Sequence, residues 1–201
     1  MTMLALVGVA FAAPHGPTAA AGVVLAPSVD LGSATLRPLV GPVVEGGYQI
    51  GDWVNHEFLV QFTTSFGGVD YGDVPLNGGA SLLTIAGGYR LRLDLFGKEG
   101  RGGVSPFLGA GLLIGAGRLG MNTSSDDPDV QQDIEDGDFA NKSESLPFLE
   151  LHALLGVRVH ATEAIGIRAE IASSTYGGIT AWQPKIGFDK SFGAPRTHTA
   201  K

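Results

Sequence analysis

The sequence predicts an all-β fold, an eight-stranded antiparallel up-and-down β-barrel that spans a membrane. The clearest signal is the segment from Phe148 to His160, FLELHALLGVRVH, which puts apolar side chains on one face and mostly charged or small ones on the other. This period of two is typical of a strand. Its length of about twelve residues fits a tilted membrane-crossing strand. The chain also has 31 glycines and only 16% charged residues, and the glycines fall inside such alternating segments.

Eight segments carry this alternation: residues 23–31, 38–50, 57–66, 80–96, 104–120, 148–160, 165–171 and 182–192. Pro42 cannot donate to a strand ladder, so we expect a β-bulge in the second segment. The connections after the second, fourth and sixth segments are short, whereas residues 67–79 and 122–146 form long ones. This asymmetry is typical of an up-and-down barrel with short turns at one end and long loops at the other.

The space inside the barrel decides which face of these strands points inward. An eight-stranded barrel has an interior just wide enough for side chains to fill. Because the glycines gather on the charged face, we expect that face to line the lumen and the bulky Leu, Ile, Val and Phe to contact lipid. The expected lumen ion network is Glu45, Glu57, Arg90, Arg92, Asp94, Glu150, His152, Arg158, Arg168, Glu170, Lys185 and Asp189. Its near balance of acids and bases favours a polar plug over a wide pore, which needs about sixteen strands.

Aromatic residues near the strand ends predict girdles at the two membrane interfaces. They are Tyr48, Trp53 and Phe188 towards the short turns, and Phe66, Tyr71, Tyr176 and Trp182 towards the loops. Phe107 and Phe148 fall on the inward face, and we expect local bulges to displace them into a girdle.

The chain ends carry their own signals. Residues 1–12 resemble a secretory signal peptide, with an apolar run and an A-x-A cleavage site ending at Ala12, although no Lys or Arg precedes the run. A start upstream of Met1 would explain that absence. Residues 13–19 are expected to be a spacer, 20–193 the barrel domain and 194–201 a tail. The absence of cysteine excludes disulfides and thiolate zinc sites.

Residues Ser105 to Gly111, SPFLGAG, resemble the Pro-aromatic-x-Gly-x-Gly strand opening of the bacterial outer-membrane β-barrel family. This family includes the small eight-stranded OmpA-like, OmpX-like and OmpW-like barrels. Phe192 resembles the family's terminal aromatic signal, although the tail Gly193 to Lys201 follows it. The resemblance implies a bacterial outer membrane with both termini in the periplasm. It implies outer-membrane lipid, lipopolysaccharide and the barrel assembly machinery as partners, and no single activity.

Negative charge is concentrated between Asn122 and Leu146. This segment has eight acids and one base, Lys142, so it carries the whole net charge of −7. A neutral body with an acidic loop argues against nucleic acid as a partner. The loop offers hard oxygens for a weak divalent site at Asp126, Asp127, Asp129, Asp133, Glu135, Asp136 and Asp138. Gln132 breaks an EF-hand frame, and a solvated, mobile outer loop is the favoured interpretation.

The sequence therefore predicts an outer-membrane barrel protein that is not an enzyme, needs no cofactor, and has a structural or surface-interaction role through extracellular loops that could bind an external ligand. Two alternatives stay open. One is a lipid-modifying barrel enzyme in which Glu150 and His152 act with a serine, although no serine-centred motif is present. The other is a soluble lipocalin-like binder of a small ligand, in which the two faces are inverted.

Overall fold

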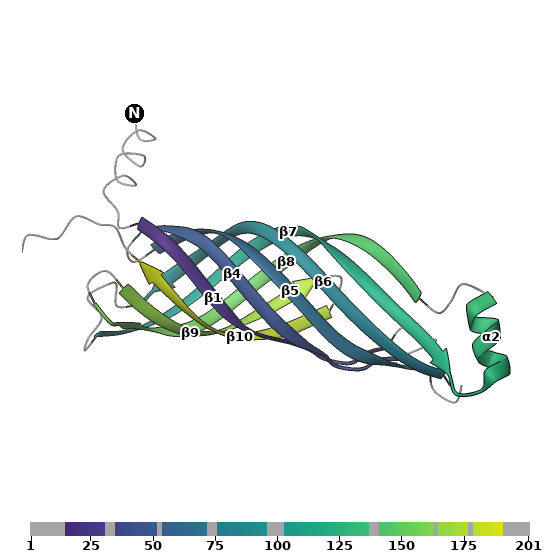
Figure 1. The fold of residues 1–201 in the computed structure, drawn as a ribbon. Helices are drawn as coiled ribbons and strands as arrows, with labels where there is room; N and C mark the ends of the chain where they lie inside the picture. The colour runs from purple at the N-terminus through teal and green to yellow at the C-terminus, as the bar shows by residue number, and fades with distance from the viewer. Residues whose placement is uncertain are drawn as a thin grey trace, which may run out of the picture.

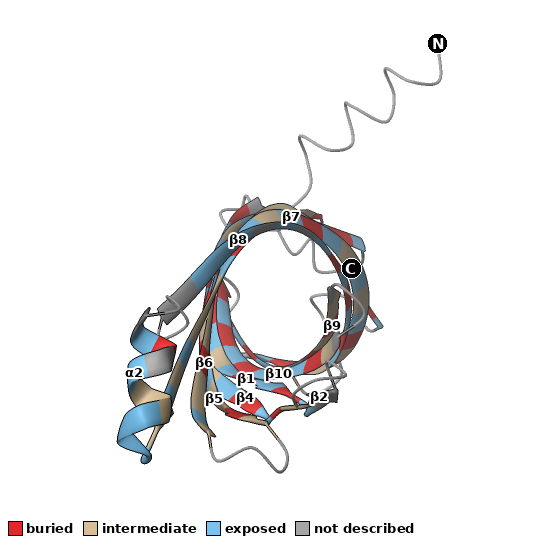
Figure 2. Ribbon diagram, turned by 90° about the vertical axis from the view of Figure 1, so that its right-hand side faces the viewer, coloured by how far each residue is buried: buried red, intermediate tan, exposed pale blue. Residues whose placement is uncertain are grey.

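The computed structural model describes residues 15–30, 35–51, 54–71, 76–95, 103–136, 141–162, 165–176 and 179–190. Successive long strands pair antiparallel, and the first pairs with the last, so that an eight-stranded barrel closes (Figure 1). Viewed along its axis, the barrel is a ring (Figure 2). The predicted fold class is confirmed. The strands are β1 His15–Ala26, β4 Leu39–Gly51, β5 Val54–Asp70, β6 Leu76–Asp94, β7 Val104–Ser125, β8 Asn141–His160, β9 Ile165–Tyr176 and β10 Ile179–Lys190.

Burial alternates along every long strand, which appears as alternating colours around the ring in Figure 2. On β8 and β9, Leu155 and Ile167 are 64% and 49% exposed, whereas Arg158 and Arg168 are 2% and 0% exposed. The bulky face is therefore the outer wall and the charged face is the inner one, as the argument from interior space predicts.

Two predicted bulges are absent. Pro42 pairs with Val23 of β1, and the ladder between β4 and β5 keeps one register on both sides of it, with Val40 opposite Phe66 and Val43 opposite Thr63. The bulge prediction at Pro42 is wrong, because a missing N–H interrupts a ladder without requiring an inserted residue.

Phe107 also lies in a regular ladder, opposite Asp94 on β6 and Gly156 on β8. It is 2% exposed, so its predicted place in an outer girdle is wrong. The inner wall has room for the ring because Gly156 has no side chain there, and a Cβ at Gly156 would collide with Phe107 Cζ. Arg92 Cζ lies 5.1 Å from the ring centroid. The side chain of Phe148 lies outside the described residues.

Four strands are much longer than the others. β5 to β8 have 17 to 22 residues, whereas β1, β4, β9 and β10 have 12 or 13. The long strands continue past the barrel rim towards the helix α2 (Figure 1). We call this continuation, residues 67–70, 76–82, 118–125 and 141–147, the extended sheet. Two short antiparallel strands of two residues each, β2 Val29–Asp30 and β3 Thr35–Leu36, extend this sheet, and β3 pairs with β5.

The extended sheet changes several predicted boundaries. Most of the predicted loop 67–79 is strand, and the predicted acidic loop 122–146 loses residues to β7 and β8. The rest of that loop contains the helix α2, Pro128–Asp136. Asp127 caps this helix through its Oδ1, which accepts a hydrogen bond of 3.0 Å from Asp129 N, and Ile134 is buried. β1 begins at His15, so residues 15–19 belong to the barrel and not to a spacer.

The described residues form no helix with the length and apolar character needed to cross a membrane. Residues 1–14 and 191–201 lie outside the described ranges, and so do the predicted signal peptide, Phe192 and the tail. The same holds for Trp53 and for the side chain of Tyr176.

Candidate functional site

The barrel interior near the short turns holds a connected network of ion pairs. Glu45 is its centre, with Arg90 Nη2 at 2.9 Å, Arg168 Nη2 at 3.1 Å and Lys185 Nζ at 2.6 Å from its carboxylate. These residues come from β4, β6, β9 and β10, so the network ties together strands from all around the barrel wall. The strands that this network joins are far apart in the sequence, so no local sequence pattern predicts their contact.

Glu57 is the second centre of the network. Its carboxylate lies 2.6 Å from Arg90 Nε, 2.6 Å from Arg92 Nη1 and 2.8 Å from Arg168 Nη1. The pairs continue towards the turns through Asp94, Arg158 and Asp189. Five carboxylates and five cations take part: Glu45, Glu57, Asp94, Glu170 and Asp189 with Arg90, Arg92, Arg158, Arg168 and Lys185. The formal charges of this network cancel.

Burial makes these pairs strong determinants of the fold. All ten side chains are at most 2% exposed. Arg90 binds Glu45 as a fork, with Nη1 and Nη2 donating to the two oxygens of its carboxylate at 3.4 and 2.9 Å, which is the geometry in which arginine binds a carboxylate most strongly. Removing one partner would leave an unpaired charge inside the wall, at a cost of about 3–5 kcal/mol.

Glu150 and His152 stand apart from this network. Glu150 Oε1 lies 2.7 Å from His152 Nε2, and both residues are buried. Ser174 on β9 lies directly opposite His152 in the ladder, and Gln183 Nε2 donates a hydrogen bond of 2.8 Å to its Oγ. Sequence reasoning missed Ser174 because it belongs to no motif; its place on the inward face, opposite His152, follows only from the strand register.

Burial keeps this trio away from substrates outside the barrel. Ser174 is 0% exposed and His152 is 3% exposed, so a lipid ester outside the barrel does not reach either one. The Oγ of Ser174 is also engaged by Gln183. The arrangement resembles a buried layer of polar side chains more than a nucleophile and its base.

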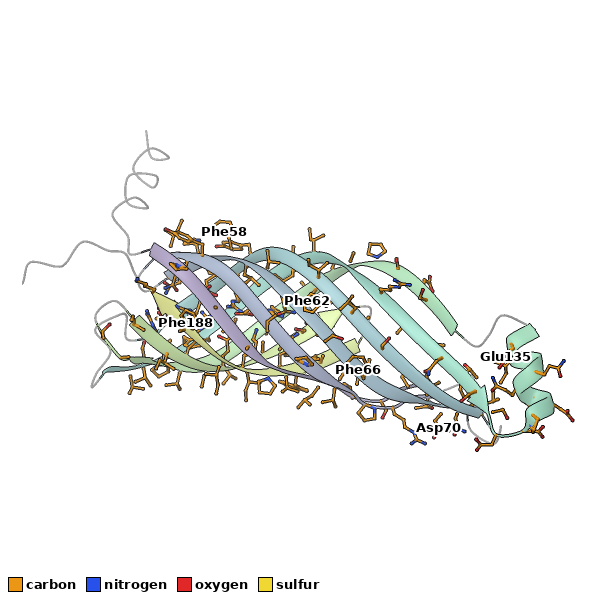
Figure 3. All side chains as sticks on the ribbon, in the orientation of Figure 1. Phe58, Phe62, Phe66, Asp70, Glu135 and Phe188 are labelled. Carbon is orange, nitrogen blue, oxygen red and sulfur yellow. The ribbon has the colours of Figure 1, made fainter. Side chains whose placement is uncertain are left out.

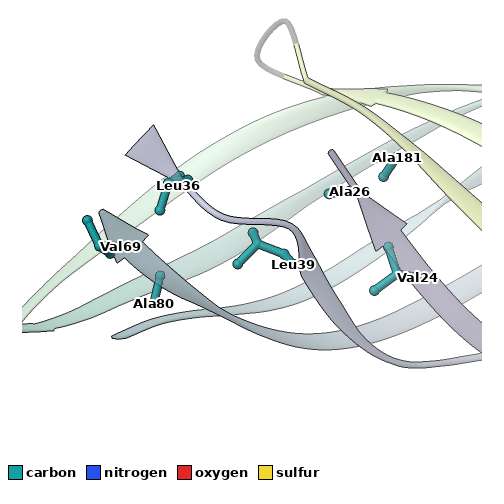
Figure 4. Close-up of a cluster of buried hydrophobic side chains, with 7 residues drawn as sticks. All are labelled: Val24, Ala26, Leu36, Leu39, Val69, Ala80 and Ala181. Carbon is teal, nitrogen blue, oxygen red and sulfur yellow. The ribbon is translucent and has the colours of Figure 1, made fainter. Parts of the chain in front are cut away.

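A cluster of buried apolar side chains lies at the loop end of the barrel (Figure 4). Leu36 of β3 and Leu39 of β4 lie against Val69 and Ala80 in one buried cluster, which Val24, Ala26 and Ala181 complete. Leu82 and Met121 of the extended sheet pack against this cluster. Tyr71, just after β5, does so too, and its Oη lies 2.7 Å from Thr123 Oγ1.

The outer wall of the barrel carries a broad apolar belt. Phe58, Phe62 and Phe66 follow β5 along this wall, and Asp70 lies beyond them near α2 (Figure 3). Of the predicted girdle residues, Tyr48, Phe66, Trp182 and Phe188 are 41–59% exposed, whereas Tyr71 packs inward against the apolar cluster. The belt includes Val60, Ile85, Leu108, Ile114, Leu149, Leu151, Leu155, Ile171 and Ile186, each at least 47% exposed.

Polarity reverses in the extended sheet. Its outward positions on β6 and β7 include Asn77, Ser81, Arg118 and Asn122, whereas its inward positions include Ala80 and apolar side chains such as Leu82, Leu119 and Met121. The barrel wall is apolar outside and charged inside, and its continuation is polar outside and apolar inside.

The acidic residues of the predicted divalent site take separate partners. Asp126 accepts a hydrogen bond from Asn77, Asp127 caps α2, and Glu135 accepts one from Gln131 at 2.7 Å. Within the described ranges no group of three His, Asp or Glu side chains could hold a metal ion. Asp138 and the side chains of Asp133 and Asp136 lie outside the described residues, so the predicted divalent site stays a prediction.

Comparison with known proteins places the fold. No protein-family model matches the sequence, and no curated protein matches it either. Among solved structures, Neisserial surface protein A is similar at a TM-score of 0.53 and 18% identity, over 89% of this chain and 97% of that one. The outer membrane protein OprG from Pseudomonas aeruginosa is similar at a TM-score of 0.50 and 13% identity, over 89% and 97% of the two chains. The chain therefore has the fold of the small eight-stranded outer-membrane β-barrels.

Proposed function

We propose that this protein is an integral barrel of a bacterial outer membrane, with a lumen plugged by ion pairs and a structural or surface-interaction role at its extended end. The observation that carries the proposal is the reversal of polarity along β6 and β7. A wall with bulky apolar residues outside and arginines inside is stable when hydrocarbon surrounds it. The extended sheet has the opposite arrangement, which is stable in water.

The interior contacts support the proposed plug. The ten-residue network fills the turn end, the layer of Glu150, His152 and Ser174 comes next, and the apolar cluster fills the loop end. A lumen filled in this way supports a role other than passage of solutes. Reconstitution in planar lipid bilayers should give no stable ion conductance, and a large open channel would contradict the plug.

The extended end is the part suited to contact partners. The extended sheet and α2 project from the barrel rim, and α2 lies within the acidic segment (Figure 1). The short turns and both ends of the described chain lie at the opposite rim, which we propose faces the periplasm. The buried Ser174 and His152 favour a role without catalysis over a lipid-modifying enzyme.

Two measurements test the proposal. Folded protein should need detergent for extraction and should migrate faster on gels than heat-denatured protein, whereas solubility without detergent would favour the lipocalin-like alternative. The sequence has no cysteine, so single cysteines report orientation cleanly. An impermeant maleimide should label Asp129→Cys on α2 in intact cells, and should label Ala161→Cys in the β8–β9 turn only after permeabilisation. The reverse pattern would contradict the proposed orientation.

A further inference from the structure

The outer face of the extended sheet has a hollow of about 650 Å³ between β5, β6, β7 and β8. Small residues create it. Phe66, Ser81, Gly120 and Ser143 follow one another across the four strands in register, so that a glycine with a serine on each side forms the floor. Arg118 and Asn122, on the same face of β7, flank Gly120 along the strand.

Arg118 differs from the other arginines that the structure describes. Arg37, Arg90, Arg92, Arg158 and Arg168 each have a carboxylate within 4.0 Å. Arg118 has none among the described residues, and its Nη2 donates to the neutral Ser143 Oγ at 3.0 Å. A guanidinium has five N–H groups and a permanent charge, so Arg118 keeps both charge and donors for an anion.

The hollow begins where the apolar belt ends. On the same face of β7, Ile114 is 65% exposed and Ala116 is exposed, and Arg118 is the next outward residue. Its partner across the ladder to β6 is Leu83, which is 43% exposed. Phe66, at 59% exposure, lines the hollow and continues the row of phenylalanines on β5. A lipid molecule beside this wall would therefore place acyl chains on the belt and its head group at Arg118.

We propose that this hollow binds the phosphate of a phosphorylated glycolipid of the outer leaflet. Arg118 supplies the charge, and Ser81, Ser143 and Asn122 supply uncharged hydrogen-bonding groups around it. Arginine suits this task because its planar fork matches the oxygens of a phosphate. The inference rests on the proposed membrane location, and it adds a specific ligand site to it.

The test compares three probes with the purified, detergent-folded full chain: bisphosphorylated lipid A, its dephosphorylated form and inorganic phosphate. Native mass spectrometry should show lipid A bound to the wild-type protein. Arg118→Gln should weaken this binding about tenfold or more, as expected for loss of a charge-assisted hydrogen bond. Arg118→Lys should recover part of it. Gly120→Leu should block the hollow without changing the charge.

The matched control is Arg37→Gln, which removes an exposed arginine at the same end of the molecule that already pairs with Asp70. It should leave lipid A binding unchanged. Equal binding by wild type and Arg118→Gln, or equal binding of the dephosphorylated lipid, would overturn the proposal. Displacement of lipid A by equimolar inorganic phosphate would show a site for free anions and would also overturn it. Heat-modifiable migration of each variant tests barrel formation separately, so loss of lipid binding with normal migration concerns only the site.

Discussion

The extended sheet continues four of the eight strands of the barrel wall, yet on β6 and β7 the two regions have opposite polarity. In the wall, Ile114 of β7 is 65% exposed, while Arg90 and Arg92 of β6 face the axis and are at most 1% exposed. In the parts of β6 and β7 that belong to the extended sheet, Asn77 and Asn122 face outward, and Leu82 and Met121 pack inward. A strand has the same backbone geometry in both places. The difference is the one we expect when hydrocarbon surrounds the wall and water surrounds the extended sheet.

The interior shows the same contrast. The wall encloses ten acidic and basic side chains in a network of ion pairs, and the rim near the extended sheet encloses Leu36, Leu39 and Val69. Ion pairs inside a narrow barrel hold a particular set of strands in register, because each charge needs its own partner. Apolar packing replaces ion pairs at the rim near the extended sheet.

The largest expected effect comes from breaking the charged interior. Arg168→Met removes one of the three cations that pair with each of Glu45 and Glu57 and should lower the free energy of unfolding by about 3–5 kcal/mol. Arg37→Met, which removes an exposed pair with Asp70, should change it by about 0–1 kcal/mol. Urea titration in phospholipid vesicles measures both. Equal effects would mean that the buried network contributes no more than a surface pair.

The next effect compares two outward positions on β7. Ile114→Arg puts a charge in the apolar belt and should destabilise the folded protein in vesicles by about 2–4 kcal/mol. Asn122→Arg puts the same side chain on the extended sheet, where we expect about 0–1 kcal/mol. If both changes cost the same, the two outer faces would share one environment and the contrast would fail.

The smallest effect concerns α2. Asp127→Ala removes the cap on Asp129 N and should destabilise the helix by about 1 kcal/mol. Hydrogen exchange of the amides in α2 should accelerate about fivefold, and the unfolding of the barrel should not change. Asp126→Ala is the matched control, because Asp126 contacts Asn77 and does not cap the helix. Equal acceleration in both variants would contradict the assigned cap.

Most of the barrel wall could be predicted from the sequence, because alternate residues of a membrane strand face lipid and the barrel interior and differ in polarity. Leu155 and Arg158 on β8 differ in face by parity alone, and interior volume then decides which of them points inward. The same parity gave the acids and bases that meet at Glu45 and Glu57. Which base meets which acid depends on the stagger of the strands, and the sequence does not state it.

Other features could not be predicted from the sequence, because pairing with neighbouring strands decides the structure of segments whose local sequence is not typical of a strand. Gly16 and Pro17 suggest a spacer, yet they lie in β1 opposite Gln49 and Tyr48. Residues 76–79 contain two glycines and an asparagine, and their place in β6 depends on β5 and β7 on either side. The inward position of Phe107 depends on the space left by Gly156, a residue of another strand. Ser174 likewise becomes visible only through its partner His152.

The most direct test is a spin-label scan along β7, which starts from a sequence without cysteine. Single labels at Leu112→Cys, Ile114→Cys, Ala116→Cys, Asn122→Cys and Ser124→Cys sample one face of the strand in vesicles. Collisions with oxygen should dominate at the first three positions, and collisions with a water-soluble nickel chelate should dominate at the last two. Nickel access along the whole face, or oxygen access along all of it, would contradict the reversal of environment on which the account depends.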